Sequence, residues 1–144
     1  MPTARHGDVV KVTHTLYDHY GIYVEVSTGA RVIHYTGENG PQDFNGMVRE
    51  TPLSVFLNGE KEYSVCKFDP MRYKTIFSGE KTVERARSKL GQKGYNILTN
   101  NCEHFAIWCK TGEEESSQVR DLSYGIPSNV FSFLEEMFSW IGLN

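Results

Sequence analysis

Residues 18–35, DHYGIYVEVSTGARVIHY, contain two segments of β type separated by a turn signal. Residues 20–26 and residues 31–35 are rich in β-branched and aromatic side chains, which favour extended structure. The Ser-Thr-Gly sequence at residues 27–29 is typical of a short hairpin connection. We therefore expect two neighbouring antiparallel strands over this stretch.

Further segments of β type surround this hairpin. Val9, Val10 and Val12 fall in one run before it, and strands are expected near residues 47–51 and 63–68, with a turn at Asn58-Gly59 between them. Residues 37–46, GENGPQDFNG, concentrate turn-forming residues and predict a surface loop. The first half of the chain thus predicts an antiparallel sheet.

The periodicity becomes helical in the second half. Thr82 is a candidate N-cap for a helix with apolar residues at Val83, Ala86 and Leu90, ended by Gly91 or Gly94. A second helix is expected to begin at Asn100-Asn101 and to end at Gly112, with an apolar stripe formed by Cys102, Phe105, Ala106 and Cys109. Strands followed by helices predict an α+β fold in which an antiparallel sheet packs against helices.

Length and composition point to one soluble domain. The chain has 144 residues, 39% of them hydrophobic and 23% charged, which are ordinary values for a globular protein. Its formal net charge of −3 does not favour nucleic-acid binding. The odd number of cysteines, three, and the lack of an apolar run at the start predict a cytoplasmic protein, either soluble or peripheral on membranes.

Cys102 stands where a thiol can be activated, in the first turn of the second helix, whose free N–H groups favour a thiolate. The alternative is that Cys102 is one more small buried residue of the apolar stripe. A nucleophilic cysteine needs a base that is itself oriented by a third polar group. His19 and His34, on the two hairpin strands, can lie on one face of the sheet if the register allows it.

Metal binding is not expected. The chain has no Cys-x-x-Cys or His-Glu-x-x-His motif. Cys102 and Cys109 are two helical turns apart, which is a core spacing, and we read Cys66 and Cys109 as inert core thiols. His104 lies on the wrong side of the helix to serve Cys102.

Two motifs give the chain a family resemblance. Residues 101–105, NCEHF, and residues 18–24, DHYGIYV, resemble the NC and H-box motifs of the lecithin:retinol acyltransferase-like family. Residues 117–121, SQVRD, are similar to a segment of its phospholipase A/acyltransferase branch. The resemblance covers about residues 7–121 and implies a circularly permuted papain-like fold of the NlpC type, in which the histidines precede the cysteine.

The resemblance also implies roles for individual residues. Cys102 would be the nucleophile, His19 the general base and His34 the residue that orients His19. Tyr17 and the backbone N–H of Cys102 would stabilise the oxyanion. The implied reaction is phospholipase A1/A2 cleavage of a glycerophospholipid through an acyl-thioester on cysteine, followed by transfer of the acyl group to water, an amine or a lysolipid, without a metal or other cofactor.

The domain prediction separates a catalytic domain, residues 1–125, from a C-terminal amphipathic tail, residues 126–144. In the tail an apolar stripe can either pack on the domain as a helix or contact a membrane; it is formed by Val130, Phe133, Leu134, Met137 and Ile141.

Two other function classes remain open. A cysteine peptidase or amidase on the same fold would use the same three residues. A non-catalytic regulatory protein of the H-box/NC type, as in some viruses, would use the fold to bind partners. Retinol is the less expected acceptor, because the branch that esterifies it carries extra segments between the two motifs.

Overall fold

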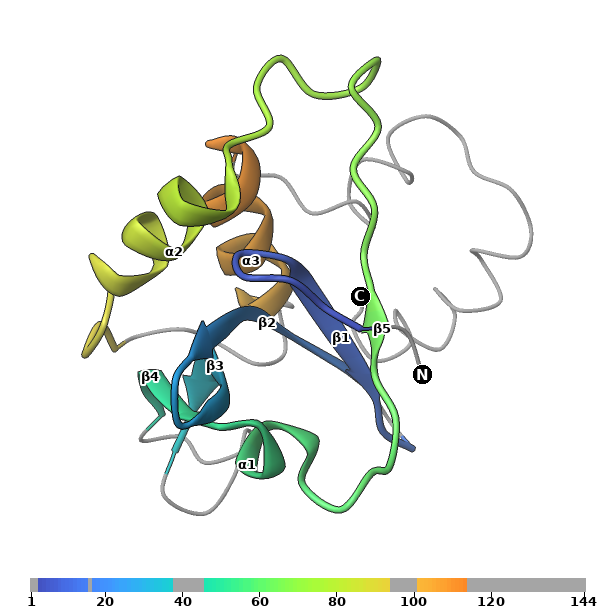
Figure 1. The fold of residues 1–144 in the computed structure, drawn as a ribbon, viewed down its shortest axis with the longest axis vertical. Helices are drawn as coiled ribbons and strands as arrows, with labels where there is room; N and C mark the ends of the chain where they lie inside the picture. Colours follow the sequence, from blue (N-terminus) through green and yellow to red (C-terminus); the bar gives the residue numbers. More distant parts are fainter. Residues whose placement is uncertain (1–2, 16, 38–45, 94–100, 114–144) are drawn as a thin grey trace.

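The computed structural model describes residues 3–15, 17–37, 46–93 and 101–113 of the chain. Their architecture is α+β, with one five-stranded antiparallel sheet in the order β4-β3-β2-β1-β5 (Figure 1). The strands are β1 (Val9–Thr13), β2 (Asp18–Val26), β3 (Gly29–Thr36), β4 (Met47–Pro52) and β5 (Ser64–Val65). The helices are α1 (Leu53–Leu57), α2 (Gly79–Arg87) and α3 (Asn101–Thr111).

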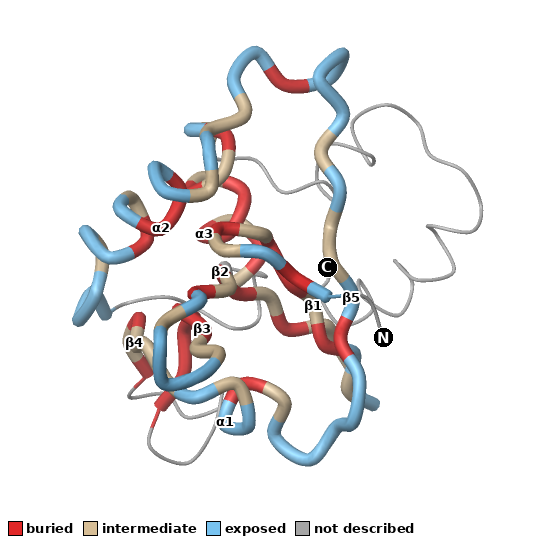
Figure 2. Tube along the Cα trace, viewed as in Figure 1, coloured by how far each residue is buried: buried red, intermediate tan, exposed pale blue. Residues whose placement is uncertain are grey.

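Helices α2 and α3 lie on one face of the sheet and α1 lies on the other (Figure 1). Alternate residues of a strand point to opposite faces, so each strand contributes to two cores. The core under α2 and α3 is formed by Val9, Ile22, Val24, Ile33, Val48, Val83, Ala86, Phe105, Ala106 and Cys109. The core under α1 is formed by Ala4, Val10, Val12, Val32, Phe56 and Tyr63. Figure 2 shows the buried segments along the central strands and α3.

The hairpin and the cysteine-bearing helix are confirmed. Strands β2 and β3 pair from Ile22↔Ile33 to Val26↔Gly29, so the connection is two residues long. Helix α3 ends as predicted at Gly112, whose φ of 82° is the left-handed conformation that favours glycine. Its N–H donates to the carbonyl of Trp108 over 2.9 Å.

The predicted bounds of the other helix were wrong. Ser78, not Thr82, is the N-cap of α2, because its hydroxyl accepts the N–H of Lys81 over 3.2 Å. Thr82 lies buried inside the helix, where its hydroxyl donates to the carbonyl of Ser78. Leu90 lies beyond the helix and is 44% exposed.

Two further differences concern the segment after β4. Helix α1 was not predicted, and the strand expected over residues 63–68 is only the two-residue β5. The burial of Phe56 accounts for the position of α1, because its fully buried ring packs this short helix against the sheet.

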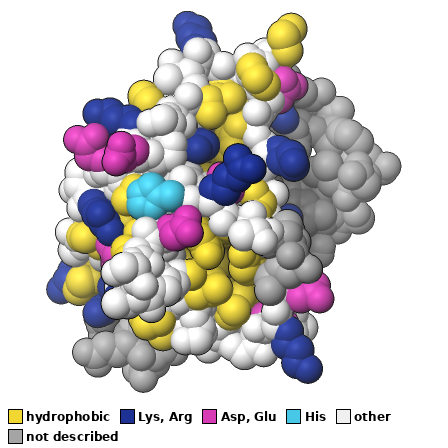
Figure 3. Space-filling model, viewed as in Figure 1, with side chains coloured by type: hydrophobic (Ala, Val, Ile, Leu, Met, Phe, Trp, Pro, Cys, Tyr) yellow, Lys and Arg dark blue, Asp and Glu magenta, His cyan; other side chains and the backbone are white. Residues whose placement is uncertain are grey.

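The predicted tail, residues 126–144, the domain boundary at residue 125 and most of the predicted loop, residues 38–45, lie outside the described residues. No described helix combines the length and the apolar character needed to cross a bilayer. On the face drawn in Figure 3, side chains of both charge signs are interspersed with hydrophobic ones.

Candidate active site

Two imidazoles from neighbouring strands contact each other inside the protein. His19 is the second residue of β2, His34 lies in β3, and each is 1% exposed. Nε2 of His19 lies 2.8 Å from Nδ1 of His34, and the two rings meet edge to face at 5.0 Å. The hairpin register therefore brings the two predicted histidines into direct hydrogen-bond contact.

Phe56 of α1 holds both rings in place. Its ring stacks on His19 and meets His34 edge-on, with 5.2 Å between ring centres in each case. Gly21 makes this packing possible: a Cβ at residue 21 would collide with the side chain of Val32 and lie 3.1 Å from the Phe56 ring. The glycine of the DHYGIYV segment thus has a packing role beside the histidines.

Burial keeps both imidazoles neutral. Desolvation lowers the pKa of His34 to about 3. Desolvation also lowers the pKa of His19 well below its usual value, and the nearby His34 and His14 lower it further. At neutral pH each ring therefore carries one N–H and one bare nitrogen.

Cys102 reaches the site from the first turn of α3. Its Sγ lies 3.8 Å from the backbone carbonyl of Asp18, the residue that precedes His19. Tyr23 of β2 exchanges backbone hydrogen bonds with the segment before β1. Asp18 and Tyr20 are an odd number of residues away from Tyr23, so their main-chain N–H and carbonyl groups point toward the opposite edge of the strand. The β2–β3 pairing begins only at Ile22, so the thiol lies at the start of β2, where this strand pairs with β1 but not with β3.

The thiol is protonated at rest. Desolvation raises the pKa of Cys102 to about 12, although hydrogen bonds from the backbone of Tyr20 and Glu103 favour the thiolate. The negative charges of Glu103 and Asp18 add to the increase. The thiol and both imidazoles are therefore neutral at neutral pH, so a proton must leave the sulfur when it reacts.

Tyr17 lies close to the sulfur. Burial raises the pKa of its phenol, and so does the proximity of a negative charge on Cys102. The phenol meets the His19 ring edge-on at 6.4 Å. At neutral pH Tyr17 keeps its proton, so its hydroxyl is available as a hydrogen-bond donor beside the thiol.

Two residues near the site were not found by sequence reasoning. Thr51 of β4 places its hydroxyl 2.8 Å from Nε2 of His34. His14 lies 5.0 Å from the Tyr17 ring, and its Nδ1 is 3.3 Å from a carboxylate oxygen of Glu60. Neither residue belongs to a motif; the one available signal was that Thr51 ends a strand that could pair with that of His34.

The other cysteines are also protonated at neutral pH. Burial raises the pKa of Cys66 to about 11 and raises that of Cys109, which is fully buried. In the described part of the chain, no three His, Cys, Asp or Glu residues gather in a way that could hold a metal ion.

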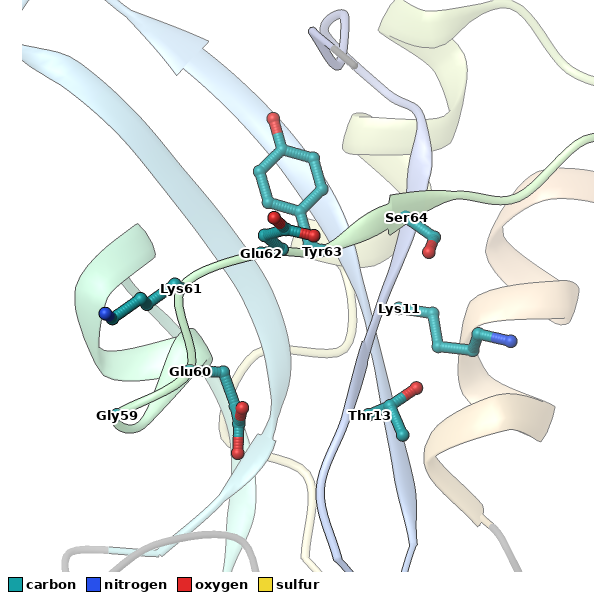
Figure 4. Close-up of a pocket in the computed structure, with 8 residues that line it drawn as sticks. All are labelled: Lys11, Thr13, Gly59, Glu60, Lys61, Glu62, Tyr63 and Ser64. Carbon is teal, nitrogen blue, oxygen red and sulfur yellow. The ribbon is translucent and has the colours of Figure 1, made fainter. Parts of the chain in front are cut away.

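An open pocket of about 530 Å³ adjoins the site. Its lining, drawn in Figure 4, consists of Lys11, Thr13, Gly59, Glu60, Lys61, Glu62, Tyr63 and Ser64. Two residues of the lining contact residues that surround the thiol: Thr13 donates to the Asp18 carboxylate over 2.9 Å, and Glu60 pairs with His14. Because its lining includes lysine and glutamate side chains, the pocket can contact ligand groups of either charge.

Comparisons with known proteins agree with the two motifs. The sequence model of a family described as lecithin retinol acyltransferase matches residues 2–115. The chain is 28% identical over 134 residues to lecithin retinol acyltransferase from Mus musculus, a match that covers 78% of this chain and 57% of that protein. It is 30% identical over 127 residues to phospholipase A and acyltransferase 2 from Homo sapiens, covering 82% of this chain and 77% of that protein.

A third relative has similar coverage. The chain is 27% identical over 135 residues to phospholipase A and acyltransferase 3 from Mus musculus, covering 84% of this chain and 79% of that protein. The chain thus spans little more than half the length of the retinol acyltransferases that it matches and over three quarters of these phospholipase relatives.

Proposed function

Because the chain belongs to the lecithin retinol acyltransferase family, we propose that it is a thiol-dependent lipid enzyme in which Cys102 takes an acyl chain from a glycerophospholipid. The observation that carries this proposal is the buried His19–His34 pair, together with the thiol of Cys102 against the main-chain carbonyl of Asp18, the residue before His19. The names of the relatives supply the substrate class: lecithin in one group and phospholipase A in the other.

In the first half of the reaction, Sγ of Cys102 attacks the ester carbonyl while its proton passes to His19. A sulfur–carbon bond forms, the bond from the carbonyl carbon to the glycerol oxygen breaks, and His19 returns the proton to the leaving lysophospholipid. The Tyr17 hydroxyl and the Cys102 backbone N–H, at the N-terminal end of α3, stabilise the oxyanion. His34 keeps the His19 ring in position through the 2.8 Å contact.

In the second half, an acceptor attacks the thioester and the sulfur leaves. Water gives a free fatty acid, which is phospholipase A1 or A2 activity. An amine or a lysolipid gives N- or O-acyl transfer. The acceptor loses its proton to His19, which passes it to Sγ, so one site accounts for both activities.

The arrangement of the chain supports a permuted papain-like fold of the NlpC type as part of the same proposal. The histidines stand on β2 and β3, ahead of the cysteine helix α3 in the chain. An experimental structure superposed on an NlpC-type peptidase tests this assignment. Overlap of the sheet, of α3 and of both histidines is expected, and a different position of the cysteine helix relative to the sheet would refute it.

The test of the function uses a phosphatidylcholine with a different acyl chain at each glycerol position. Mass spectrometry follows lysolipid, free fatty acid and the mass of the intact protein. Wild type is expected to release lysolipid and to carry an acyl adduct, Cys102→Ser to release none, and Cys66→Ser to behave as wild type. The fatty acid released identifies the position that is cleaved.

Parallel reactions contain a primary amine, a lysolipid or retinol, and the acylated product identifies the acceptor. Absence of any Cys102-dependent release or adduct, with all proteins folded by circular dichroism, contradicts the lipid function. Cleavage of peptide or amide substrates by the same protein would then identify a peptidase or amidase. Inactivity on both substrate classes would favour a non-catalytic binding module.

We place the protein in the cytoplasm, with peripheral membrane contact through the apolar stripe of residues 126–144. The proposed lipid substrate, the stripe residue Phe133 and the nearby aromatic residue Trp140 support this placement. The test is sedimentation of the full chain with phosphatidylcholine vesicles. Binding that is lost in Trp140→Glu but kept in Cys102→Ser is expected, and equal binding of both variants would refute the role of the tail.

A further inference from the structure

Thr51, which is not part of either motif, continues the hydrogen-bonded chain that starts at His19. Its hydroxyl lies 2.8 Å from Nε2 of His34 and donates to the backbone carbonyl of Pro52 over 3.1 Å. His34 in turn contacts His19 through its other nitrogen. Four groups thus follow one another in a line, from the Pro52 carbonyl to the His19 ring.

The direction of each hydrogen bond in this line follows from the Pro52 carbonyl, which can only accept. With the single proton of the Thr51 hydroxyl assigned to that carbonyl over 3.1 Å, the hydroxyl accepts toward His34. Nε2 of His34 therefore carries the proton of this neutral ring and its Nδ1 is bare. Nδ1 then accepts from Nε2–H of His19, which leaves Nδ1 of His19 bare as well.

We infer that Thr51 is a positioning residue: by holding His34 in its Nε2–H form, it leaves Nδ1 of His19 free to accept the proton of Cys102. This inference deepens the proposed function and rests on it. Nδ1 is the ring nitrogen nearer to the main chain of His19, and the thiol lies against the carbonyl of Asp18, the preceding residue. Because Nε2 of His19 is engaged with His34, Nδ1 is the ring nitrogen left to receive the thiol proton.

The opposite tautomer would disable the base. If His34 carried its proton on Nδ1, it would donate to Nε2 of His19, and the proton of His19 would then occupy Nδ1. The nitrogen that should receive the thiol proton would be blocked, although every heavy atom stayed in place. A wrong tautomer of this kind is costly in hydrolases that use a histidine base.

The experiment compares Thr51→Val, which keeps the shape and removes the hydroxyl, with Thr51→Ser, which keeps the hydroxyl. The first measurement is the tautomer of each ring in the protein without substrate, from two-bond ¹H–¹⁵N NMR spectra of ¹⁵N-histidine-labelled protein. Wild type and Thr51→Ser are expected to carry the proton on Nε2 in both rings. Thr51→Val is expected to show Nδ1–H forms.

The second measurement is the rate of Cys102 acylation by phospholipid or by an activated ester, as a function of pH. We expect Thr51→Val to be slower by about tenfold or more across the profile, because only molecules with the correct tautomer react. Thr51→Ser is expected to restore the rate to within about threefold of wild type, since it keeps the accepting oxygen.

The results separate this inference from the proposed function. An Nδ1–H form of either ring in wild type, or identical tautomers in wild type and Thr51→Val, overturns the role of Thr51 whether or not lipids are cleaved. A tautomer change that leaves acylation by the activated ester unaltered overturns it too. If Thr51→Val does not fold, Thr51→Ala takes its place. If no protein cleaves lipid but the tautomers follow Thr51, the proposed substrate fails and the positioning role stands.

Discussion

Cys102 and His19 are both uncharged at rest because the fold removes water from them. Burial raises the pKa of the thiol to about 12 and lowers that of the imidazole, so the two shifts oppose a resting thiolate–imidazolium pair. In the proposed reaction the site therefore acts by general-base catalysis, and the thiolate forms only as the acyl carbon is attacked.

This state of the thiol predicts how Cys102 reacts with iodoacetamide. Only the thiolate is nucleophilic, and its fraction below the pKa increases tenfold per pH unit. We expect the alkylation rate of Cys102, followed by mass spectrometry of its peptide, to rise about tenfold per unit from pH 6 to 9 without a plateau. A rate that is already constant above pH 5 would show an ion pair and contradict the assignment. Cys66, with a pKa of about 11, serves as an internal reference.

Sequence reasoning singled out Cys102, His19 and His34 as candidates because each belongs to a motif at a recognisable place in a helix or strand. The contact between the two histidines depended on the register, which the hairpin turn alone did not determine; the pairing Val26↔Gly29 determines it in the structure. Thr51 was not identified, because its contact with His34 arises from the pairing of β4 with β3, which no local pattern specifies.

At the scale of elements, Arg85 of α2 joins its helix to the C-terminal end of α3. Its guanidinium donates to the carbonyls of Trp108 and Cys109 over 2.8 and 3.1 Å. It also lies over the rings of Trp108 and Phe77, 3.9 and 4.5 Å from their centres. A cation at these carbonyls satisfies groups that a helix end leaves free.

We predict that Arg85→Lys lowers the free energy of unfolding by about 1–3 kcal/mol, because lysine cannot donate to both carbonyls in the same fork or stack on the rings. Urea denaturation measures the effect. The matched control is Arg87→Lys in the same helix, whose pair with Glu50 is at the surface and is expected to change stability by less than about 1 kcal/mol. Equal losses of unfolding free energy in the two variants would show that the contacts of Arg85 between the helices stabilise the fold no more than the surface pair of Arg87.

The elements themselves were predictable where local signals are strong. The apolar spacing of α3 and the final Gly112 placed that helix correctly. The start of α2 was misplaced because Ser78 and Thr82 are both residue types that cap helices; in the structure Ser78 is the cap and Thr82 is buried inside the helix. Helix α1 is one turn long and depends on the burial of Phe56, so its own sequence carried little helical signal.

For the whole molecule, the buried histidine pair links stability to pH. An unfolded chain binds a proton on histidine below about pH 6.5, whereas folded His34 stays neutral down to about pH 3. Between these values the unfolded state holds more protons, so acid favours unfolding. The stabilisation from a neutral His34 is fully present above pH 6.5 and is lost as the pH falls toward 3.

We therefore predict that wild type loses stability between pH 7 and pH 5 more steeply than His34→Gln, which cannot titrate. The difference for one histidine of this kind is about 2 kcal/mol over that interval. Urea denaturation at both pH values measures it, and Cys102→Ser, which keeps both imidazoles, is expected to follow wild type. If wild type and His34→Gln lose the same free energy of unfolding, His34 is not held neutral in the fold. The tautomer chain from Thr51 to His19 would then lack the neutral ring on which it depends.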